Sequence, residues 1–267
     1  MPATDLPDPF ALAPLARPDL VARRELPVFG VKAELHCLPG RRHRPGAPLG
    51  KRAPFQRCRV DEIIAGEAVW RDGGVVLTGN RFPFAARHVV LWTEERTREA
   101  PLALLEAAIA FEDRFAATAL VNTTGAAASI ARAHVHLVGE RLAFLDGFPR
   151  EPLVAGWLEP RTDVEVVRLS APYPIVAVGL VGPAGARARA AHRLLQLRNH
   201  AAVNVVSSSG VTWVFPHGEH ETPEPHFPFA LGASELWGRW CYAEREAFER
   251  ATSEALEQAL LRAGVAW

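Results

Sequence analysis

From residue 60 onward, the chain alternates between short apolar stretches and turn-forming residues. Val75–Thr78 and His88–Thr93 are rich in β-branched and apolar residues, and Gly79–Phe84 between them contains Gly, Asn and Pro. Such a pattern is typical of strands that are joined by a loop. It predicts two neighbouring strands in this part of the chain.

Pro101 opens a segment whose apolar side chains recur at helical spacing. Because Pro is favoured at the start of a helix, this recurrence predicts an amphipathic helix of about four turns. A strand is expected at Thr118–Asn122, followed by a small-residue turn at Gly125–Ser129. The apolar positions of the helix are Leu104, Leu105, Ala108, Ile109, Phe111 and Phe115.

The segment Ala133–Val138 alternates polar and apolar residues. Successive side chains of a strand point to opposite faces of the sheet. The alternation therefore places His134 and His136 on one face of a strand, with Val135 and Leu137 on the other.

The second half of the chain shows a similar succession. Because strand, helix and strand follow one another in both halves, the pattern suggests an internal pseudo-repeat. The first ~25 residues are expected to lie across the surface, with helical content over Leu12–Arg24. The later elements are strands at Val164–Leu169, Ile175–Leu180, Ala202–Val206 and Val211–Phe215, and helices at Ala184–Arg198 and Arg239–Ala263.

Composition limits the class of protein. The 267 residues carry 30 basic and 30 acidic side chains, so the formal net charge is zero. A neutral chain has no long-range attraction to nucleic acids or anionic membranes, and we expect neither as a partner. No apolar run approaches the ~20 residues of a membrane span, and the N-terminus has no signal-peptide pattern. At ~100–200 residues per domain, the length allows one large domain or two small ones.

The use of individual residue types adds two expectations. Three cysteines in a chain of this length argue against a disulfide framework, so we expect a cytoplasmic protein. Lysine occurs only at Lys32 and Lys51, whereas Arg, Ala and Pro are abundant, which is typical of a GC-rich bacterial genome. The number of arginines is therefore not a sign of phosphate binding.

Residues 122–139 hold the most informative group of polar side chains. Asn122 ends a strand, a turn with Gly125 and Ser129 follows, and His134 and His136 share one strand face. Backbone N–H groups and the Asn and Ser side chains can bind phosphate oxygens, while an imidazole can attack phosphorus. The neighbouring histidine or Arg132 could stabilise the developing charge. The pattern thus predicts a phosphate site with a histidine nucleophile.

Other interpretations of the histidines stay open. His134 and His136 could lie on a half-exposed strand without a functional role. They could also ligate zinc, although no third ligand stands at a convincing spacing, so no cofactor is indicated and a divalent metal is left open. Cys37 could form a site together with His36, His43 and Cys58, but buried inert thiols are the simpler interpretation.

The order of these motifs resembles the histidine-triad (HIT) superfamily. The resemblance rests on Asn80–Phe84, a strand that begins at His88, a helix, and the window from Asn122 to His136. The chain is most similar to the branch with galactose-1-phosphate uridylyltransferase, diadenosine tetraphosphate phosphorylase and GDP-hexose phosphorylase. This resemblance implies an α+β fold, in which an antiparallel HIT-like sheet packs against helices and one chain contains two HIT-like halves.

The resemblance covers about residues 60–240, since residues 203–217 and 231–238 look similar to the second half of that branch. It implies three regions. Residues 1–59 would form an N-terminal arm and basic loop, residues 60–150 the half with the His-x-His strand, and residues 151–267 a second, degenerate half.

The triad itself is incomplete in this chain. The resemblance implies a strand of the form His-φ-His-φ-His or His-φ-His-φ-Gln, with the middle histidine as the group that becomes nucleotidylated. Counted without a gap from Ser129, Arg132 is first, His134 is the nucleophile and His136 is third. With one insertion, His134 is first, His136 is the nucleophile and Val138 is third. We favour the first register because it preserves the residues that follow the strand.

The resemblance also implies roles for other residues. A basic Pro/Gly-rich loop spans residues 37–57, and its Arg42 could clamp distal phosphates, although a solvated basic loop is an equal alternative. The implied nucleoside residues are Asn80, Phe82 and Pro83, and the implied phosphate residues are Asn122, Gly125 and Ser129.

The function implied is nucleotidyl transfer. A nucleotidyltransferase, phosphorylase or hydrolase of this kind would act on an NDP-sugar or a dinucleoside polyphosphate, a small phosphorylated nucleotide. Two alternatives remain: a HIT-fold enzyme with acid–base chemistry in secondary metabolism, or a non-catalytic nucleotide-binding protein. A homodimer is left open.

Overall fold

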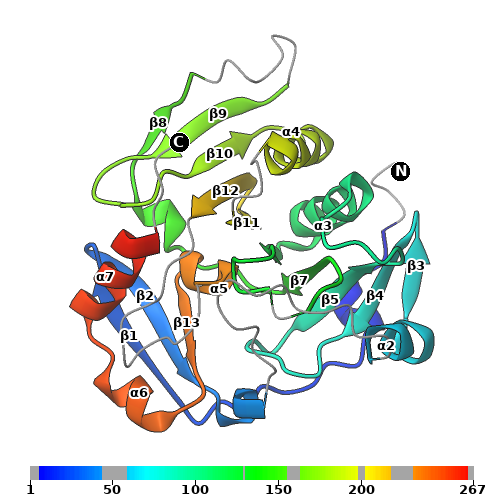
Figure 1. Cartoon of the computed structure of the whole chain (residues 1–267), viewed down its shortest axis with the longest axis horizontal. Helices are drawn as coiled ribbons and strands as arrows, with labels where there is room; N and C mark the ends of the chain where they lie inside the picture. The colour runs from blue at the N-terminus through cyan, green and yellow to red at the C-terminus, as the bar shows by residue number, and fades with distance from the viewer. Residues whose placement is uncertain are drawn as a thin grey trace.

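The computed structural model describes residues 6–43, 59–128, 130–154, 163–197, 202–217 and 231–263. Its centre is an antiparallel sheet that is ten-stranded over these residues (Figure 1). In spatial order the strands are β3 (Trp70–Asp72), β4 (Val75–Gly79), β5 (His88–Thr93), β7 (His134–Val138), β6 (Thr118–Asn122), β11 (Ala202–Ser208), β12 (Val211–His217), β10 (Val178–Val181), β9 (Glu165–Leu169) and β8 (Arg150–Pro152).

Both halves of this sheet have the same topology. In the first half, β4 and β5 are followed by helix α3 (Leu102–Phe115), β6 and β7. In the second half, β9 and β10 are followed by helix α4 (Ala184–Leu197), β11 and β12. In each half, the last strand in the sequence inserts between the two strands before it: β7 lies between β5 and β6, and β12 lies between β10 and β11. The halves join through the antiparallel pair β6–β11. The expected α+β fold and the pseudo-repeat are confirmed.

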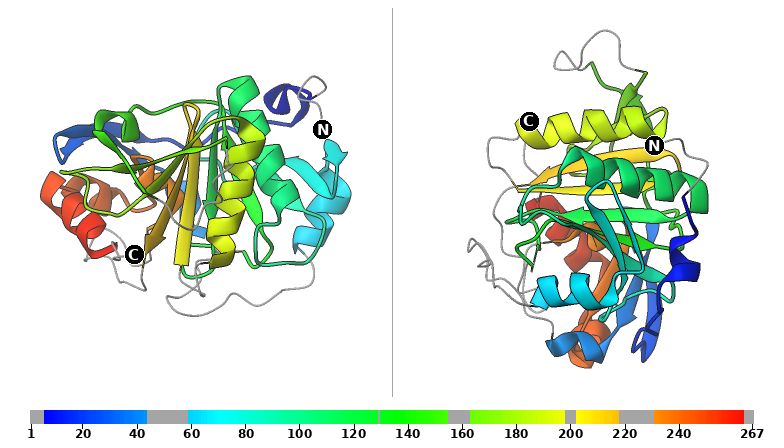
Figure 2. Two further views of the ribbon diagram at one scale, coloured as in Figure 1. Left: turned by 90° about the horizontal axis from the view of Figure 1, so that it is seen from above. Right: turned by 90° about the vertical axis from the view of Figure 1, so that its right-hand side faces the viewer.

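One face of the sheet is covered by α3 and α4, which lie side by side in both views of Figure 2. Arg187 of α4 ties them to the central strands. Its side chain is fully buried and donates to Glu112 of α3 over 3.1 Å and to Ser207 and Thr212 over 3.0 Å each. Among the described residues, no helix is long and apolar enough to cross a membrane.

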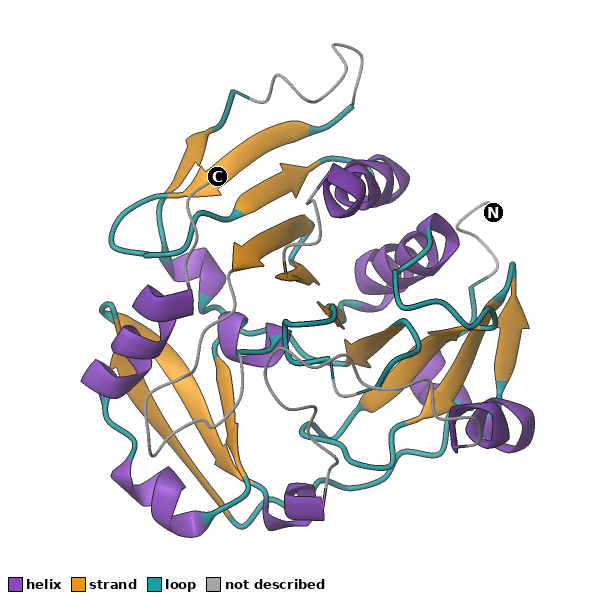
Figure 3. Ribbon diagram, viewed as in Figure 1, coloured by secondary structure: helices purple, strands orange, loops and turns teal. Residues whose placement is uncertain are grey.

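The opposite face of the sheet is covered by two separate layers (Figure 3). On one side, helix α2 (Arg59–Glu67) packs its Ile64 on a small apolar cluster. On the other side lies a three-stranded sheet with short helices, whose buried residues Trp237 and Trp240 pack in one cluster with Trp213 of the large sheet. This layer contains β1 (Ala22–Val28), β2 (Val31–Cys37), β13 (Arg239–Tyr242), α5 (Ala233–Leu236), α6 (Arg245–Arg250) and α7 (Ser253–Ala263); the remaining short elements are α1 (Pro9–Leu12), η1 (Pro39–His43) and η2 (Leu145–Gly147).

Two expectations about the chain ends are wrong. The segment expected to be helical, Leu12–Arg24, leads into strand β1, and the helix expected over Arg239–Ala263 begins with strand β13. β1 pairs with β2, and β13 adds to β2 in parallel. The cause is tertiary pairing, which overrides the weak local helical signal. Residues 1–59 are therefore more than an arm, because they include a β-hairpin.

An ion-pair network fixes strand β7 to the small sheet. Arg239 is 2% exposed at its side chain and donates to Glu34 over 2.6 Å and to Glu140 over 2.5 Å and 2.9 Å. Glu140 follows the last residue of β7 by two positions. The imidazole of His36 completes the network at 3.3 Å from the Glu34 carboxylate.

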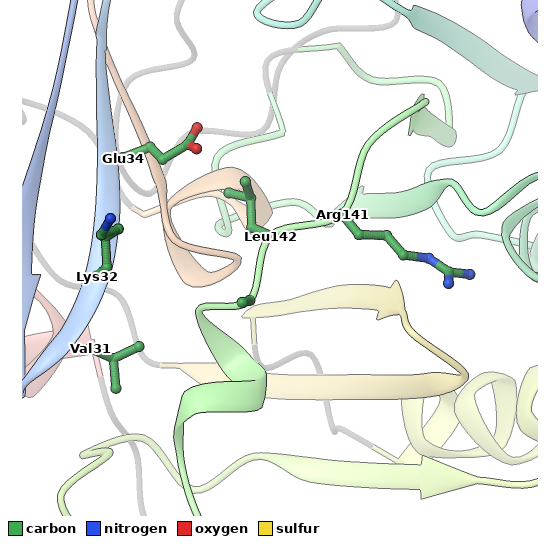
Figure 4. A pocket seen from close by; sticks show the side chains of 6 residues that line it. Val31, Lys32, Glu34, Arg141 and Leu142 are labelled. Atoms are coloured by element: carbon green, nitrogen blue, oxygen red, sulfur yellow. The ribbon is translucent and has the colours of Figure 1, made fainter.

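A cavity of about 250 Å³ lies beside this network (Figure 4). Arg141 belongs to its wall, but its guanidinium turns away toward α3 and stands 3.6 Å from the Glu112 carboxylate. The charged groups around the cavity therefore already have protein partners. The lining residues are Val31, Lys32, Glu34, Arg141, Leu142 and Ala143.

The Glu34 network should make the stability of the fold sensitive to acid. The His36 imidazole and the Arg239 guanidinium lower the pKa of Glu34 from 4.5 to about 2, against the opposing effect of burial. A carboxylate with a lowered folded-state pKa contributes fully above its unfolded pKa, and the contribution is lost as the pH falls toward the folded value. We therefore expect Glu34→Gln to lower the free energy of unfolding at pH 7 by roughly 1–3 kcal/mol.

Urea unfolding between pH 7 and pH 2.5 would measure this effect. The wild type should lose stability more steeply than Glu34→Gln below about pH 4.5, where the unfolded carboxyl starts to bind its proton. Glu25→Gln is the matched control, because Glu25 is paired only at the exposed surface with Arg23 and Lys32. Parallel pH curves for wild type and Glu34→Gln would contradict the inference.

Candidate functional site

Three histidines form a row on one face of the large sheet. His134 and His136 lie on the same face of β7, as the sequence predicts, and His88 lies on that face of the neighbouring strand β5. The ring centroid of His136 is 5.1 Å from that of His88 and 5.0 Å from that of His134. The row thus contains the predicted histidine pair and a third imidazole from another strand.

Asn80 connects the predicted nucleoside loop to this row. Its Oδ1 accepts from the backbone N–H of Phe82 over 2.9 Å, which leaves its Nδ2 as the donor on the other side. That Nδ2 lies 2.8 Å from Nε2 of His88, which in turn lies 3.1 Å from Nδ1 of His136. The ring of Phe84 packs edge-on against His88 at a centroid distance of 4.3 Å. The loop and the histidine strand therefore meet at Nε2 of His88.

His134 is held differently, by the main chain. Its Nδ1 lies 2.8 Å from the backbone oxygen of Arg132. Because a carbonyl oxygen can only accept, this nitrogen carries the proton, and the lone pair of the neutral ring is on Nε2. His134 is 4% exposed, and the ring of Trp92 lies against it at 5.0 Å with an angle of 32° between the planes. The local structure thus fixes both the tautomer and one face of the imidazole.

Arg132 has a structural partner. It is 6% exposed, and its guanidinium donates to the carboxylate of Asp61 in α2 over 2.5 Å and to the backbone oxygen of Glu94 over 3.4 Å. Asp61 also pairs with Arg96. The positive charge expected to act on a transition state is therefore compensated by Asp61, and it fixes the start of β7 to α2.

Asn122 lies beside His134 and links it to the second half of the chain. The β6–β7 ladder pairs Val121 with Val135, so Asn122 and His134 occupy the next position on each strand. The Oδ1 of Asn122 accepts from the side chain of Asn204 and from the backbone N–H of Ala233, each over 2.7 Å. The second half thus positions a residue at the predicted phosphate site.

The turn after Asn122 has the conformation that its small residues predict. Gly125 has φ of 86°, in the left-handed region that favours glycine. The turn is closed by a hydrogen bond from the N–H of Ala126 to the oxygen of Thr123 over 2.9 Å. Ser129, the predicted hydroxyl of this turn, lies outside the described residues.

The predicted nucleoside loop presents an aromatic ring on a fixed backbone. Phe82 is 42% exposed, its N–H donates to Asn80, and its carbonyl accepts from Arg41 over 2.8 Å. Pro83 is buried next to it. The side chain of Arg42 lies outside the described residues, so its neighbour Arg41 is the described contact of the basic loop with this site.

The sequence interpretation missed several residues of this site. The signal for His88 was an imidazole at the start of an otherwise apolar strand, eight residues after Asn80. Trp92 and Asp61 gave no local signal. Glu235 of α5 is buried, which raises its pKa, and its Oε2 accepts from the N–H of Gly232 over 2.9 Å.

The described residues contain no group of three or more His, Cys, Asp and Glu side chains arranged to hold a metal ion. Cys37, a member of the alternative cysteine cluster, is buried with a free thiol, and burial raises the pKa of that thiol. Cys58 and the side chain of His43 lie outside the described residues.

The fold has counterparts among solved structures. The Ap4A phosphorylase Apa2 of yeast, in complex with Ap4A, superposes with a TM-score of 0.63 at 16% identity, over 94% of this chain and 91% of that one. Its complex with AMP gives the same TM-score and identity over 91% and 87%. No protein-family model and no curated protein matches the sequence. The likeness is one of fold, and it confirms the HIT-like architecture that the order of motifs implies.

Gly232 offers a test of how α5 meets the site. A methyl group there would lie 3.0 Å from Oε2 of Glu235 and 3.4 Å from both Oδ1 of Asn122 and Cβ of Ala127. We expect Gly232→Ala to shift Asn122 and to lower the free energy of unfolding by about 1–2 kcal/mol, because a packed neighbour must move.

Gly66→Ala in α2 is the matched control. A methyl group at Gly66 would meet no heavy atom within 4 Å, so alanine should leave stability unchanged or raise it by up to about 1 kcal/mol. Urea unfolding of the two variants would measure the difference. Equal stabilities would show that the contact between α5 and Asn122 is loose.

Proposed function

We propose that the protein is a nucleotidyltransferase or phosphorylase that acts on a nucleoside diphospho-compound, either an NDP-sugar or a dinucleoside polyphosphate. The observation that carries this proposal is the hydrogen bond between Nδ1 of His134 and the oxygen of Arg132. It supports a nucleophile with its lone pair on Nε2, on the sheet face that also carries Asn122. The complexes of Apa2 with Ap4A and AMP support a nucleotide-type ligand.

The reaction has two displacements at phosphorus. In the first, Nε2 of His134 forms a bond to the α-phosphorus, and the bond from phosphorus to the bridging oxygen breaks with its electron pair on the leaving phosphate. In the second, an oxyanion of phosphate or a sugar phosphate, or a water that gives up a proton, forms the new bond to phosphorus as the N–P bond breaks and its electron pair returns to Nε2. The ring of the intermediate is positively charged while Nδ1 keeps its proton, and the Arg132 carbonyl stabilises that charge.

We assign the nucleophile to His134 rather than His136. The Nδ1 proton of His134 faces a carbonyl oxygen, which cannot exchange it, whereas Nδ1 of His136 faces another imidazole, that of His88. His134 is also the histidine that stands opposite Asn122, the predicted phosphate residue, at the next position of the β6–β7 ladder. In this assignment, His136, His88 and Asn80 orient the leaving phosphate and the nucleoside loop.

The ion pair between Arg132 and Asp61 favours a second candidate function. The side chain of Arg132 occupies the first position of the triad and is paired with Asp61 rather than directed at a ligand. A site without that first imidazole could use His134 and His136 as base and acid in a reaction without phosphoryl transfer.

Trapping of a covalent nucleotide would test the assignment. The full chain is incubated with Ap4A and with ADP-, GDP- and UDP-hexoses labelled at the α-phosphorus, and the labelled residue is mapped under alkaline conditions. We expect the label on His134. His134→Asn should abolish it, and His136→Asn should slow its formation by about 10–100-fold because the second imidazole only assists.

The outcomes separate the candidate functions. A label on His136 in the His134→Asn variant would overturn the assignment of the nucleophile. Turnover that requires His134 but forms no covalent nucleotide would favour the acid–base alternative. Tight nucleotide binding that both histidine variants keep, without turnover, would indicate a non-catalytic binding protein.

Phe82 supplies a test of nucleoside binding at the loop. We propose that a base stacks on its exposed ring, because both backbone groups of Phe82 are fixed by hydrogen bonds. Stacking of a base on an aromatic side chain contributes about 1–3 kcal/mol. Phe82→Ala should therefore raise KM roughly ten-fold or more and change kcat little.

Leu197→Ala is the matched control for this variant. Leu197 lies at the end of α4, on the opposite face of the sheet, and is 44% exposed, close to the 42% of Phe82. Steady-state kinetics should show no change in KM for the control. The same KM in Phe82→Ala and wild type would place the base elsewhere.

A further inference from the structure

We propose that Trp92 is a positioning residue for His134, which fixes the face of the imidazole and so aligns Nε2 for attack; this inference rests on the proposed function. Trp92 lies directly opposite His134 in the β5–β7 ladder. The two ring centroids are 5.0 Å apart, the planes are 32° from parallel, and each residue is 4% exposed. The rings are thus in contact out of reach of bulk water.

The indole is itself held in one orientation. Its Nε1 donates to Oγ1 of Thr78 over 2.9 Å, and Oγ1 of Thr78 donates to the oxygen of Gly79 over 3.0 Å. Thr78 is fully buried on β4. Because rotation of the indole would leave a buried N–H without an acceptor, the ring plane that His134 meets is fixed.

Helix α2 supports His134 along two routes. Its Ile64 packs in the same apolar cluster as Trp92, which contacts the face of the imidazole. Its Asp61 binds the side chain of Arg132, whose backbone oxygen accepts from Nδ1 of His134. One helix therefore sets both the hydrogen bond and the ring contact of the nucleophile.

The contact with the indole of Trp92 fixes the orientation of the imidazole plane of His134, which the hydrogen bond to Nδ1 alone does not. The hydrogen bond to Nδ1 fixes the distance from the ring to the carbonyl oxygen, but not the angle of the ring plane about that line. At the first triad position stands Arg132, whose side chain turns to Asp61, so a neighbouring imidazole is absent from that position. The indole restricts the tilt from one side. It also attracts the positive charge of the nucleotidylated ring, since a cation within about 6 Å of an indole face is stabilised.

Two variants of Trp92 separate positioning from packing. Trp92→Phe keeps an aromatic face without the indole N–H, and Trp92→Leu removes the aromatic face. In single-turnover assays with labelled substrate, we expect adduct formation to slow about ten-fold in Trp92→Phe and about 100-fold in Trp92→Leu. KM should stay within about two-fold of wild type, because the ring acts on the reacting imidazole and not on substrate binding.

Val76→Ala is the matched control. Val76 belongs to the same apolar cluster and lies opposite Trp92 on β4, on the side of the indole away from His134. It should lower the melting temperature by several degrees, as Trp92→Leu does, and leave the rate of adduct formation unchanged. If Val76→Ala and Trp92→Leu lose the same fraction of activity, Trp92 only fills space and the proposal is overturned.

A spectroscopic readout tests the proposal without turnover. In ¹⁵N-histidine spectra of the full chain, wild type and Val76→Ala should show His134 as a single tautomer with the proton on Nδ1. Trp92→Leu should show exchange between the two tautomers of His134. If this variant keeps the single tautomer and also forms the adduct at the wild-type rate, the positioning role is overturned. If wild type forms no adduct but the spectra change as expected, the proposed function fails, while the finding that Trp92 holds the His134 imidazole in one tautomer stands.

Discussion

The antiparallel pairing of β6 with β11 is the constraint on which the rest of the molecule depends. It joins two repeats of one topology into a single sheet, and so one face can be covered by two like helices, α3 and α4. The other face cannot be covered in the same way, because α2 and the small sheet are unrelated elements. The polar residues of the candidate site lie where these two coverings meet.

This arrangement explains why the site draws on distant parts of the chain. Strand β7, which carries His134 and His136, is fixed at its start by Asp61 of α2 and after its end by Arg239 of the small sheet. Asn122 is oriented by Asn204, which comes from the second repeat. The second repeat therefore contributes to the candidate site by supporting side chains of the first repeat.

Local sequence patterns predicted those elements whose signal is local. The strands around Val75 and His88, the helix after Pro101 and the strand with His134 have clear periodicity, and the structure forms each of them. β1, which is rich in charged residues, and the four-residue β13 were missed because both edge strands acquire their conformation from pairing with β2, which no local window contains.

The same reasoning applies to the site. Residues that share a strand or turn, such as His134, His136 and Asn122, could be grouped from their spacing. The contacts of His88 and Trp92 depend on the register between β5 and β7, and that of Asp61 spans 71 positions along the chain. Such contacts follow from tertiary packing and leave no periodic trace in the sequence. The chemical roles of all these residues rest on the proposed function.

The parallel pairing of β2 with β13 has a consequence for biosynthesis. Arg239 and Glu34 are separated by 205 positions, so the hairpin of β1 and β2 leaves the ribosome long before its partner strand exists. During that interval the inner edge of β2 exposes unpaired backbone groups and one side of an apolar core, which favours chaperone binding or aggregation. Closure of such a long loop is slow compared with local folding. Strand β7 is fully anchored only after Arg239, near the end of the chain, has been made.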